Sequence, residues 1–213
     1  MGATGVLILG VQHLVVLEVP KTGSLALRAM LRPYTLPASD LAARHIGYDG
    51  YQRNHAPALS QAFGQVPQTV AVLRDPMERM QSWYRYRRRP QLKGLPASTA
   101  GVSFEDFVLA YLDGTNPAMA SIGRQDRFVG WNGRMARVDH LFDYGQLPLM
   151  EAFFSARIGA ALTLPKKNKS ARGAQIDYSL TKRVITRFQI ENLEEITLYH
   201  KVASTGHLMR PGV

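Results

Sequence analysis

Residues 14–31, LVVLEVPKTGSLALRAML, decide the fold. The first part is apolar except for Glu18 and rich in β-branched side chains, which is typical of a buried strand. Strong helix formers fill residues 25–31, and Pro33 ends that run. The residues between them, Lys-Thr-Gly-Ser at 21–24, form the connection. This stretch therefore predicts a strand, a tight loop and a helix, which together are the first half of a βαβ unit.

A second stretch repeats this plan. Residues 69–73 read as a strand, and residues 77–88 read as a helix. Asp75 is a good N-cap, and Pro76 suits the first helical position because its missing N–H has no helical partner there. Two strands that each lead into a helix favour a parallel sheet covered by helices. We expect an α/β protein with a three-layer, P-loop-like fold, in which helices flank a central parallel sheet.

The rest of the chain adds mainly helical patterns. Residues 138–142 alternate like a strand, and residues 179–202 read as one long amphipathic helix. No linker or low-complexity segment divides the chain, so we expect one domain over residues 1–213. Shorter helices are predicted over residues 56–63, 104–112 and 147–158.

The composition indicates an anionic partner. The chain has 26 Lys and Arg against 16 Asp and Glu, a formal net charge of +10, and such an excess attracts anions over a distance. Nucleic acid, an anionic membrane, an acidic glycan and a phosphorylated nucleotide all fit the charge alone. The chain has no Cys, which excludes disulfides and a cysteine nucleophile. The apolar residues 6–11 are too few to span a bilayer, so we expect a cytoplasmic protein without a membrane span.

The loop at residues 20–24, Pro-Lys-Thr-Gly-Ser, has the features of a phosphate site. Backbone N–H groups of a tight loop at a helix N-terminus point together and attract an anion, and Lys21 adds a positive charge. In the nucleotide-kinase P-loop the lysine follows the glycines and a hydroxyl binds Mg²⁺. Here the lysine precedes Gly23. This order disfavours a kinase that uses ATP and Mg²⁺, which remains the alternative enzyme.

Two motifs together resemble the sulfotransferases that use PAPS (3′-phosphoadenosine 5′-phosphosulfate), especially their carbohydrate-modifying branch. The first is Pro20–Ser24 after a hydrophobic strand, which resembles the 5′-phosphosulfate loop of that family. The second is LRDPMERMQSWY at residues 73–84, which resembles its 3′-phosphate motif, an arginine at a strand end followed eight residues later by a helical serine. The resemblance implies an enzyme that moves the sulfuryl group of PAPS to a hydroxyl or amine and releases PAP, the desulfated product.

The resemblance also implies which residues bind the donor. The loop would hold the 5′-phosphate, while Arg74 and Ser82 would hold the 3′-phosphate, to which an arginine fork is suited. The family usually carries another hydroxyl residue after Ser24, where this chain has Leu25 and Ala26. We therefore expect weaker donor binding, through backbone donors. The predicted donor-binding residues are Lys21, Thr22, Gly23, Ser24, Leu25, Arg74 and Ser82.

Two side chains are predicted to act in the transfer. Lys21 would neutralise the leaving 5′-phosphate, and no metal ion is required. His55 is the predicted general base, because residues 54–57 lie between the two motifs, where relatives resembling the heparan and chondroitin enzymes often carry a catalytic histidine. The alternative role of His55 is to cap the helix that begins near Pro57. Glu18 is the rival base; otherwise it pairs with a nearby arginine or orients the lysine.

Further basic residues have more than one interpretation. Residues 84–89, Tyr-Arg-Tyr-Arg-Arg-Arg, would suit an anionic glycan acceptor, although a solvated helix face is the simpler interpretation. Arg79 either joins the 3′-phosphate ligands or pairs with Asp75 or Glu78, and we favour the pairing. A second basic cluster at residues 166–172 is left out of the predicted site. A non-catalytic module that binds glycan or nucleic acid is a further alternative, but it leaves the paired motifs unexplained, so we expect no nucleic-acid partner. The sequence leaves the acceptor and the oligomeric state open.

Overall fold

The structure is a computed structural model that describes residues 6–37, 45–115, 117–165 and 176–212. The chain forms two compact units. The expected single domain over residues 1–213 stays a prediction. Unit 1 comprises Met1–Arg74, Gln125–Lys167 and Leu198–Val213, and unit 2 comprises Asp75–Arg124 and Asn168–Thr197.

Unit 1 contains a five-stranded sheet in the order β1-β2-β3-β4-β5. The strands are β1 (Leu7–Leu9), β2 (Leu14–Val16), β3 (Gln68–Leu73), β4 (His140–Asp143) and β5 (His207–Met209). The pairs β2–β3 and β3–β4 are parallel, whereas β1 and β5 pair antiparallel at the two edges. The predicted parallel pairing is confirmed for the three central strands, and the edge strands make the sheet mixed.

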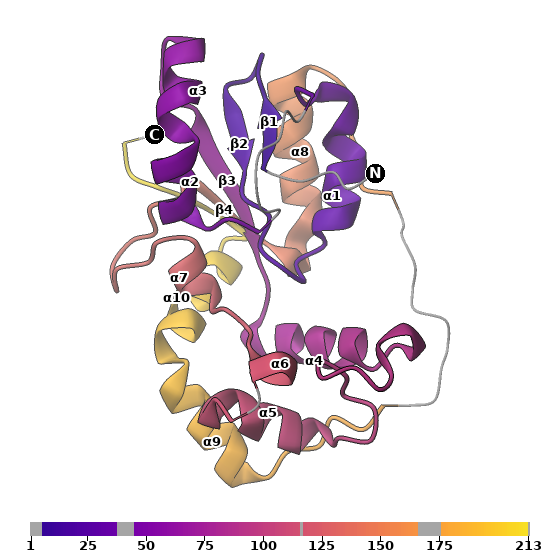
Figure 1. Cartoon of the computed structure of the whole chain (residues 1–213). Coiled ribbons are helices and arrows are strands. Elements are labelled where there is room, and N and C mark those ends of the chain that lie inside the picture. The colour runs from indigo at the N-terminus through magenta and orange to yellow at the C-terminus, as the bar shows by residue number, and fades with distance from the viewer. Residues whose placement is uncertain (1–5, 38–44, 116, 166–175, 213) are drawn as a thin grey trace. The chain divides into compact units, whose positions relative to one another are not determined.

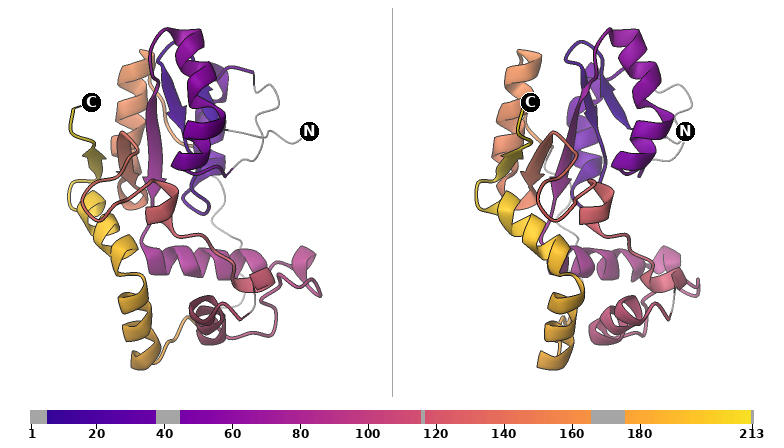
Figure 2. Two further views of the ribbon diagram at one scale, coloured as in Figure 1. Left: turned by 60° about the vertical axis from the view of Figure 1, so that its left-hand side comes forward. Right: turned by 90° about the vertical axis from the view of Figure 1, so that its left-hand side faces the viewer.

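Helices cover both faces of this sheet (Figure 1). These helices are α1 (Ser24–Leu31), α2 (Tyr48–Asn54), α3 (Ala56–Phe63) and α8 (Leu147–Ile158). On one face, α1 and α8 bury apolar side chains against Val16 and Val70, and on the other face α2 and α3 pack against Val15 and Ala71. Neighbouring residues of a strand point to opposite faces, so the continuous apolar runs of β2 and β3 supply both cores. The views in Figure 2 keep α8 and the α2–α3 pair on opposite sides of the strands.

Unit 2 is helical. Its helices include α4 (Pro76–Arg87), α5 (Phe104–Asp113), α6 (Pro117–Ala120) and α9 (Lys182–Glu191). Tyr84 and Phe107 contribute to the apolar cluster between them. Asp75 caps α4 by accepting a hydrogen bond from the Glu78 backbone N–H at 2.9 Å, and Pro76 occupies the first turn. The predicted start of this helix is therefore confirmed.

The predicted long helix over residues 179–202 is wrong, because the chain breaks there into α9 and α10 (Leu193–Ala203). Asn192 lies at the break and is buried. Its side-chain amide donates to the Phe188 carbonyl at 2.9 Å, and the Tyr111 hydroxyl donates to its Oδ1 at 2.7 Å. A side chain that competes for a helical carbonyl interrupts the regular hydrogen bonding of a helix.

Short segments complete the described chain. Within the described ranges, no helix combines the length and the apolar character that crossing a membrane requires. The short segments are η1 (Arg32–Tyr34), η2 (Pro90–Leu92), α7 (Gln125–Phe128) and η3 (Tyr144–Gln146).

Candidate functional site

The carboxyl ends of the three parallel strands lie at one edge of the sheet, with β3 between β2 and β4. The loop that contains Lys21 follows β2, Arg74 follows β3, and Tyr144 follows β4. Ligands of open α/β sheets bind outside this edge. The edge is therefore the candidate site, and two predicted groups, the loop and Arg74, lie on it in the same unit.

The loop after β2 turns through two left-handed residues. Lys21 has a φ of 71° and Gly23 has a φ of 80°, and this conformation costs a non-glycine residue about 1–2 kcal/mol. Thr22 between them is buried, and its hydroxyl donates to the Val19 carbonyl at 2.8 Å. That hydroxyl therefore holds the loop together, and the group that Thr22 offers a ligand is its backbone N–H.

Gly23 is the N-cap of α1 and has no side chain that satisfies the first N–H groups of the helix. Its carbonyl accepts hydrogen bonds from the N–H groups of Ala26 at 2.9 Å and Leu27 at 3.1 Å. Among the described residues, no acceptor is found for the N–H groups of Thr22, Gly23 and Leu25. Such N–H groups at the start of a helix form an anion site.

Arg74 is held by both its backbone and its side chain. The Gln125 amide donates to the Arg74 carbonyl at 2.8 Å, and its oxygen accepts from the Arg74 N–H at 3.0 Å. The guanidinium lies over the Tyr144 ring, 4.6 Å from the ring centroid, where a cation gains about 0.5–2 kcal/mol. These contacts orient Arg74 at the end of β3.

Tyr144 connects Arg74 to the loop. A Cβ added to Gly23 would lie 2.9 Å from Cε2 of Tyr144, so the ring packs directly against the loop. Tyr144 and Gln125 are not among the residues predicted from the sequence. The reasoning that found Arg74 also applies to Tyr144, because it follows the strand predicted at residues 138–142. Nothing in the sequence marks Gln125.

The second predicted phosphate ligand, Ser82, lies on α4 in unit 2 and is partly buried. Its pairing with Arg74 stays a prediction. Arg79, one turn earlier, is buried and donates to the Gly123 carbonyl at 2.7 Å and to the Glu195 carboxylate at 3.3 Å. The structural role predicted for Arg79 is confirmed, but its carboxylate partner comes from α10 and not from the start of α4.

Glu18, the rival base, is buried and forms an ion pair with Arg28 of α1. The Arg28 Nε also donates to Glu18 Oε1 at 3.3 Å. A charge-assisted pair of this kind ties the end of β2 to the helix that follows the loop. The pairing with an arginine, one of the roles that the sequence left open, is therefore confirmed.

His55, the predicted base, lies between α2 and α3 and is buried. Its backbone N–H donates to the Tyr51 carbonyl at 2.9 Å, and its carbonyl accepts from the Leu59 N–H at 3.1 Å. The imidazole makes no capping hydrogen bond at the start of α3, so capping by the side chain does not account for this residue. In the described part of the chain, no hydrogen bond joins His55 to the loop, and its role as a base stays a prediction.

Asp143 supplies a carboxylate at the end of β4, which the sequence analysis does not single out. It is buried and accepts hydrogen bonds at Oδ1 from the Gly145 N–H at 2.9 Å and from the Tyr199 hydroxyl at 3.2 Å. The Gln146 amide donates to Oδ2 at 3.4 Å. The carboxylate therefore shapes the turn that carries Tyr144.

The arginine-rich end of α4 packs against aromatic rings of unit 2. The Arg87 guanidinium lies over the Trp83 ring, 4.8 Å from its centroid, and burial lowers the pKa of Arg87 below its usual value. Tyr84 is almost fully buried. A sugar ring cannot stack on Tyr84, so the inner part of this run serves packing rather than acceptor binding. The second basic cluster, at residues 166–172, lies outside the described residues.

No protein-family model and no curated protein matches this chain. The features that bear on function are the motif residues and their geometry at the carboxyl edge of the sheet. That geometry is a loop with backbone donors, a lysine within it, and an arginine on the neighbouring parallel strand.

Proposed function

We propose that the protein is a PAPS-dependent sulfotransferase with a three-layer, P-loop-like fold. The proposal rests on one observation: the loop at Lys21–Ser24 and Arg74 follow neighbouring parallel strands, and the Tyr144 ring contacts both. PAPS carries phosphates at its 5′ and 3′ positions, so it needs two anion sites at this edge. A nucleoside triphosphate carries its phosphates in one chain and does not need the second site.

In this proposal the loop holds the 5′-phosphosulfate. Backbone N–H groups of residues 22–25 are the donors, which agrees with the engagement of the Thr22 hydroxyl with Val19 and with the apolar side chain at Leu25. Lys21 neutralises the charge that develops on the leaving phosphate. Leu25 and Ala26 leave that phosphate without the hydroxyl that relatives supply, so we expect modest donor affinity.

The other predicted residues complete the reaction. Arg74 binds the 3′-phosphate with a charged fork, and Ser82 adds a hydroxyl donor. His55 takes the proton of the acceptor hydroxyl or amine as that group attacks the sulfur. The acceptor is proposed to be a carbohydrate, on the resemblance of the two motifs to the carbohydrate-modifying branch.

A Mg²⁺-dependent kinase is the second candidate, because Asp143 places a carboxylate at the end of a parallel strand. Its Oδ1 already accepts two hydrogen bonds from the protein, which leaves that oxygen poorly placed to bind a metal ion. The sulfotransferase is therefore preferred, and the binding experiment includes ATP with Mg²⁺.

The test is a thermal-shift and calorimetric panel of PAP, AMP, ADP, ATP with Mg²⁺, and a short DNA duplex. A ligand that binds only the native state raises its stability. PAP is expected to give the largest increase in melting temperature. Arg74→Ala is expected to weaken the binding of PAP by about 1.5–3 kcal/mol, while the binding of AMP stays nearly unchanged. Arg127→Gln, which removes an exposed arginine of α7, is the matched control.

Two results would contradict the proposal. Stabilisation by ATP with Mg²⁺ that exceeds stabilisation by PAP would favour the kinase. Equal losses of PAP and AMP affinity in Arg74→Ala would show that Arg74 does not bind the 3′-phosphate.

A further inference from the structure

A pocket of unit 1 lies away from the carboxyl edge of the sheet. It has a volume of about 260 Å³ and lies between the segment before β4, the second half of α10, and β5 with the residues after it. Val138 lies two residues before β4, and the Arg210 N–H donates to the carbonyl of Asp139, the residue just before this strand, so these residues mark the amino end of β4. The candidate donor site lies beyond its other end, at Tyr144.

The floor of this pocket is apolar. Ala136, Val138 and Leu141 are buried in the core, and Leu208 packs beside them. Met135 and Met209 also line the pocket and are 39% and 52% exposed. Burial of a ligand against this apolar floor contributes about 25 cal/mol to binding for each Å² of apolar ligand surface that is removed from water. Flexible thioether side chains adapt to ligands of irregular shape.

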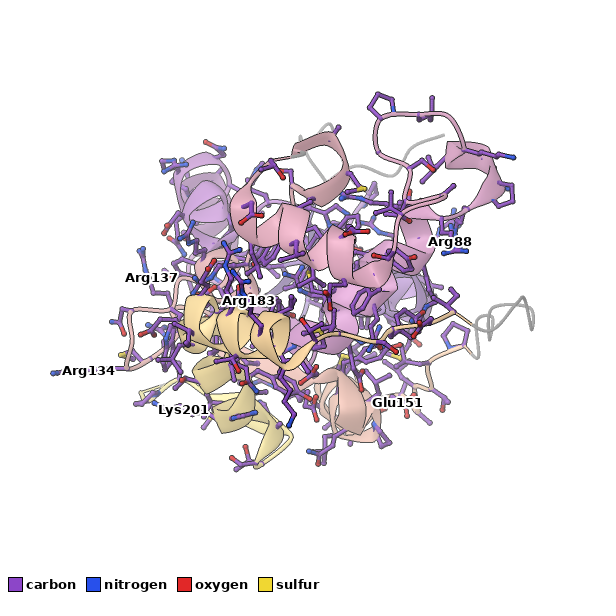
Figure 3. All side chains as sticks on the ribbon, turned by 90° about the horizontal axis from the view of Figure 1, so that it is seen from below. Arg88, Arg134, Arg137, Glu151, Arg183 and Lys201 are labelled. Carbon is purple, nitrogen blue, oxygen red and sulfur yellow. The ribbon has the colours of Figure 1, made fainter. Side chains whose placement is uncertain are left out.

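The rim of the pocket is cationic. Arg134, Lys201 and Arg210 line it, and no carboxylate of the described residues does. Arg210 forms an ion pair with Asp139 at 2.5 Å, whereas no ion pair with a described carboxylate is found for Arg134 or Lys201. The Lys201 Nζ lies 4.8 Å from the centroid of the Trp131 ring. Figure 3 shows Arg134 extending away from the ribbon, on the same side of the view as Lys201.

We infer that this pocket binds a small amphiphilic anion, with a compact apolar body and one carboxylate or sulfonate head. The apolar floor accounts for the body, and the two cations at the rim account for the sign of the head group. A neutral molecule of the same shape gains only the floor contacts. A cation of the same shape meets repulsion from Arg134 and Lys201. This inference does not depend on the proposed sulfotransferase activity, because none of these residues belongs to the donor site.

The test follows the methyl groups of ¹³C-methyl-labelled methionines by NMR while octanoate is added at neutral pH. The resonances of Met135 and Met209 are expected to shift and saturate, with a dissociation constant at or below about 1 mM. Met150 and Met80, which are buried in other clusters, are expected to stay in place. 1-Octanol is expected to bind more weakly, and octylamine and acetate are expected to produce no saturable shift.

Charge variants test the role of the rim. Lys201→Gln and Arg134→Gln are each expected to lower the affinity for octanoate about two- to fivefold, which is the range for the loss of one exposed ion pair. Arg127→Gln removes the same charge from an exposed site outside the pocket and is expected to leave the affinity unchanged. The inference is overturned if neither methionine responds at octanoate concentrations up to about 5 mM. It is also overturned if octylamine binds as tightly as octanoate. The same holds if the variant that combines Lys201→Gln with Arg134→Gln retains the full affinity for octanoate.

Discussion

The conformation of the loop after β2 depends on individual residues. Lys21 adopts a left-handed backbone although it has a side chain, and Gly23 does so where a side chain would meet Tyr144. A strained residue persists only where its surroundings hold it in place. The Thr22 hydroxyl on the Val19 carbonyl is one such contact. These contacts therefore hold the loop in its left-handed conformation.

Gly23→Ala tests this shape. The left-handed φ costs an alanine about 1–2 kcal/mol, and the new Cβ also forces the Tyr144 ring to move from 2.9 Å. Gly64→Ala is the matched control, because Gly64 has a φ of 68° with nothing within 4 Å of its added Cβ. Gly23→Ala is expected to lower the free energy of unfolding, measured in urea, more than the control does. It is also expected to weaken the binding of PAP. Equal losses in the two variants would show that Tyr144 does not support the loop.

His55 and Glu18 are separated by their different surroundings. His55→Ala is expected to lower kcat about 10²–10⁴-fold while PAP affinity stays near that of the wild type, because a general base acts only in the transition state. Glu18→Gln breaks the buried pair with Arg28 and is expected to lower the free energy of unfolding by about 3 kcal/mol. Steady-state kinetics and urea unfolding measure both variants. An active His55→Ala beside a stable but inactive Glu18→Gln would reverse the assignment.

At the level of elements, the sequence predicts what has a strong pattern. The sequence predicts β3 and α8 because a continuous apolar run marks the strand and helical spacing marks the helix. The edge strands β1 and β5 have three residues each, as β2 has, but neither is followed by a loop and helix as β2 is, so no motif marks them. At the site, motifs in the sequence predict the loop and Arg74. The place of Gln125 at the site comes from its contact with Arg74, which is 51 positions away in the chain. No local pattern contains such a contact.

The break between α9 and α10 is an element-scale feature that a single residue controls. Asn192→Ala removes the hydrogen bond from Tyr111 and the competition for the Phe188 carbonyl. We expect a loss of about 1–3 kcal/mol in the free energy of unfolding, because the hydrogen bond from the Tyr111 hydroxyl to Asn192 is removed. Tyr111→Phe is the matched variant, and urea unfolding of both and of the double variant gives the coupling between them. Losses that simply add would show that this hydrogen bond does not stabilise the break.

For the whole molecule, the count of 26 Lys and Arg overstates the number of positive charges that face a partner, although the net charge of +10 already includes their acidic partners. Arg28 and Arg79 are paired with buried carboxylates, and Arg87 is buried against Trp83. The sign of the charge still favours anionic ligands. Composition therefore indicates the class of partner, and the placement of the charges decides where that partner binds.

A histidine pair in unit 1 is expected to influence the stability of the whole molecule in acid. The Arg157 guanidinium donates to Gln68 Oε1 at 3.0 Å, and His140 Nε2 lies 3.3 Å from the same oxygen. Because a guanidinium only donates, that oxygen is an acceptor, so His140 Nε2 carries a proton. His140 Nδ1, 3.2 Å from His207 Nε2, is then the acceptor in the neutral pair. A second proton on His140 would make Nδ1 a donor, so the contact would persist only if His207 Nε2 became the acceptor.

This arrangement predicts that the protein loses stability as pH falls below about 6.5. Burial, then the nearby His207 and Arg157, lower the pKa of His140 from 6.5 to about 4, against a smaller opposing effect of Asp139. Burial also lowers the pKa of His207. The unfolded chain therefore takes up the proton first, so the stabilisation is complete above pH 6.5 and is lost as the pH falls through the folded-state pKa near 4.

His140→Gln keeps a donor for Gln68 but cannot titrate, so its urea unfolding free energy is expected to fall less than that of the wild type between pH 7 and pH 4. The difference between the two chains should reach at most about 3 kcal/mol, the value of a shift of this size. His200→Gln, which removes an exposed histidine of α10, is the control and is expected to follow the wild type. Parallel pH curves for the wild type and His140→Gln would show that the buried pair does not set the acid sensitivity of the fold.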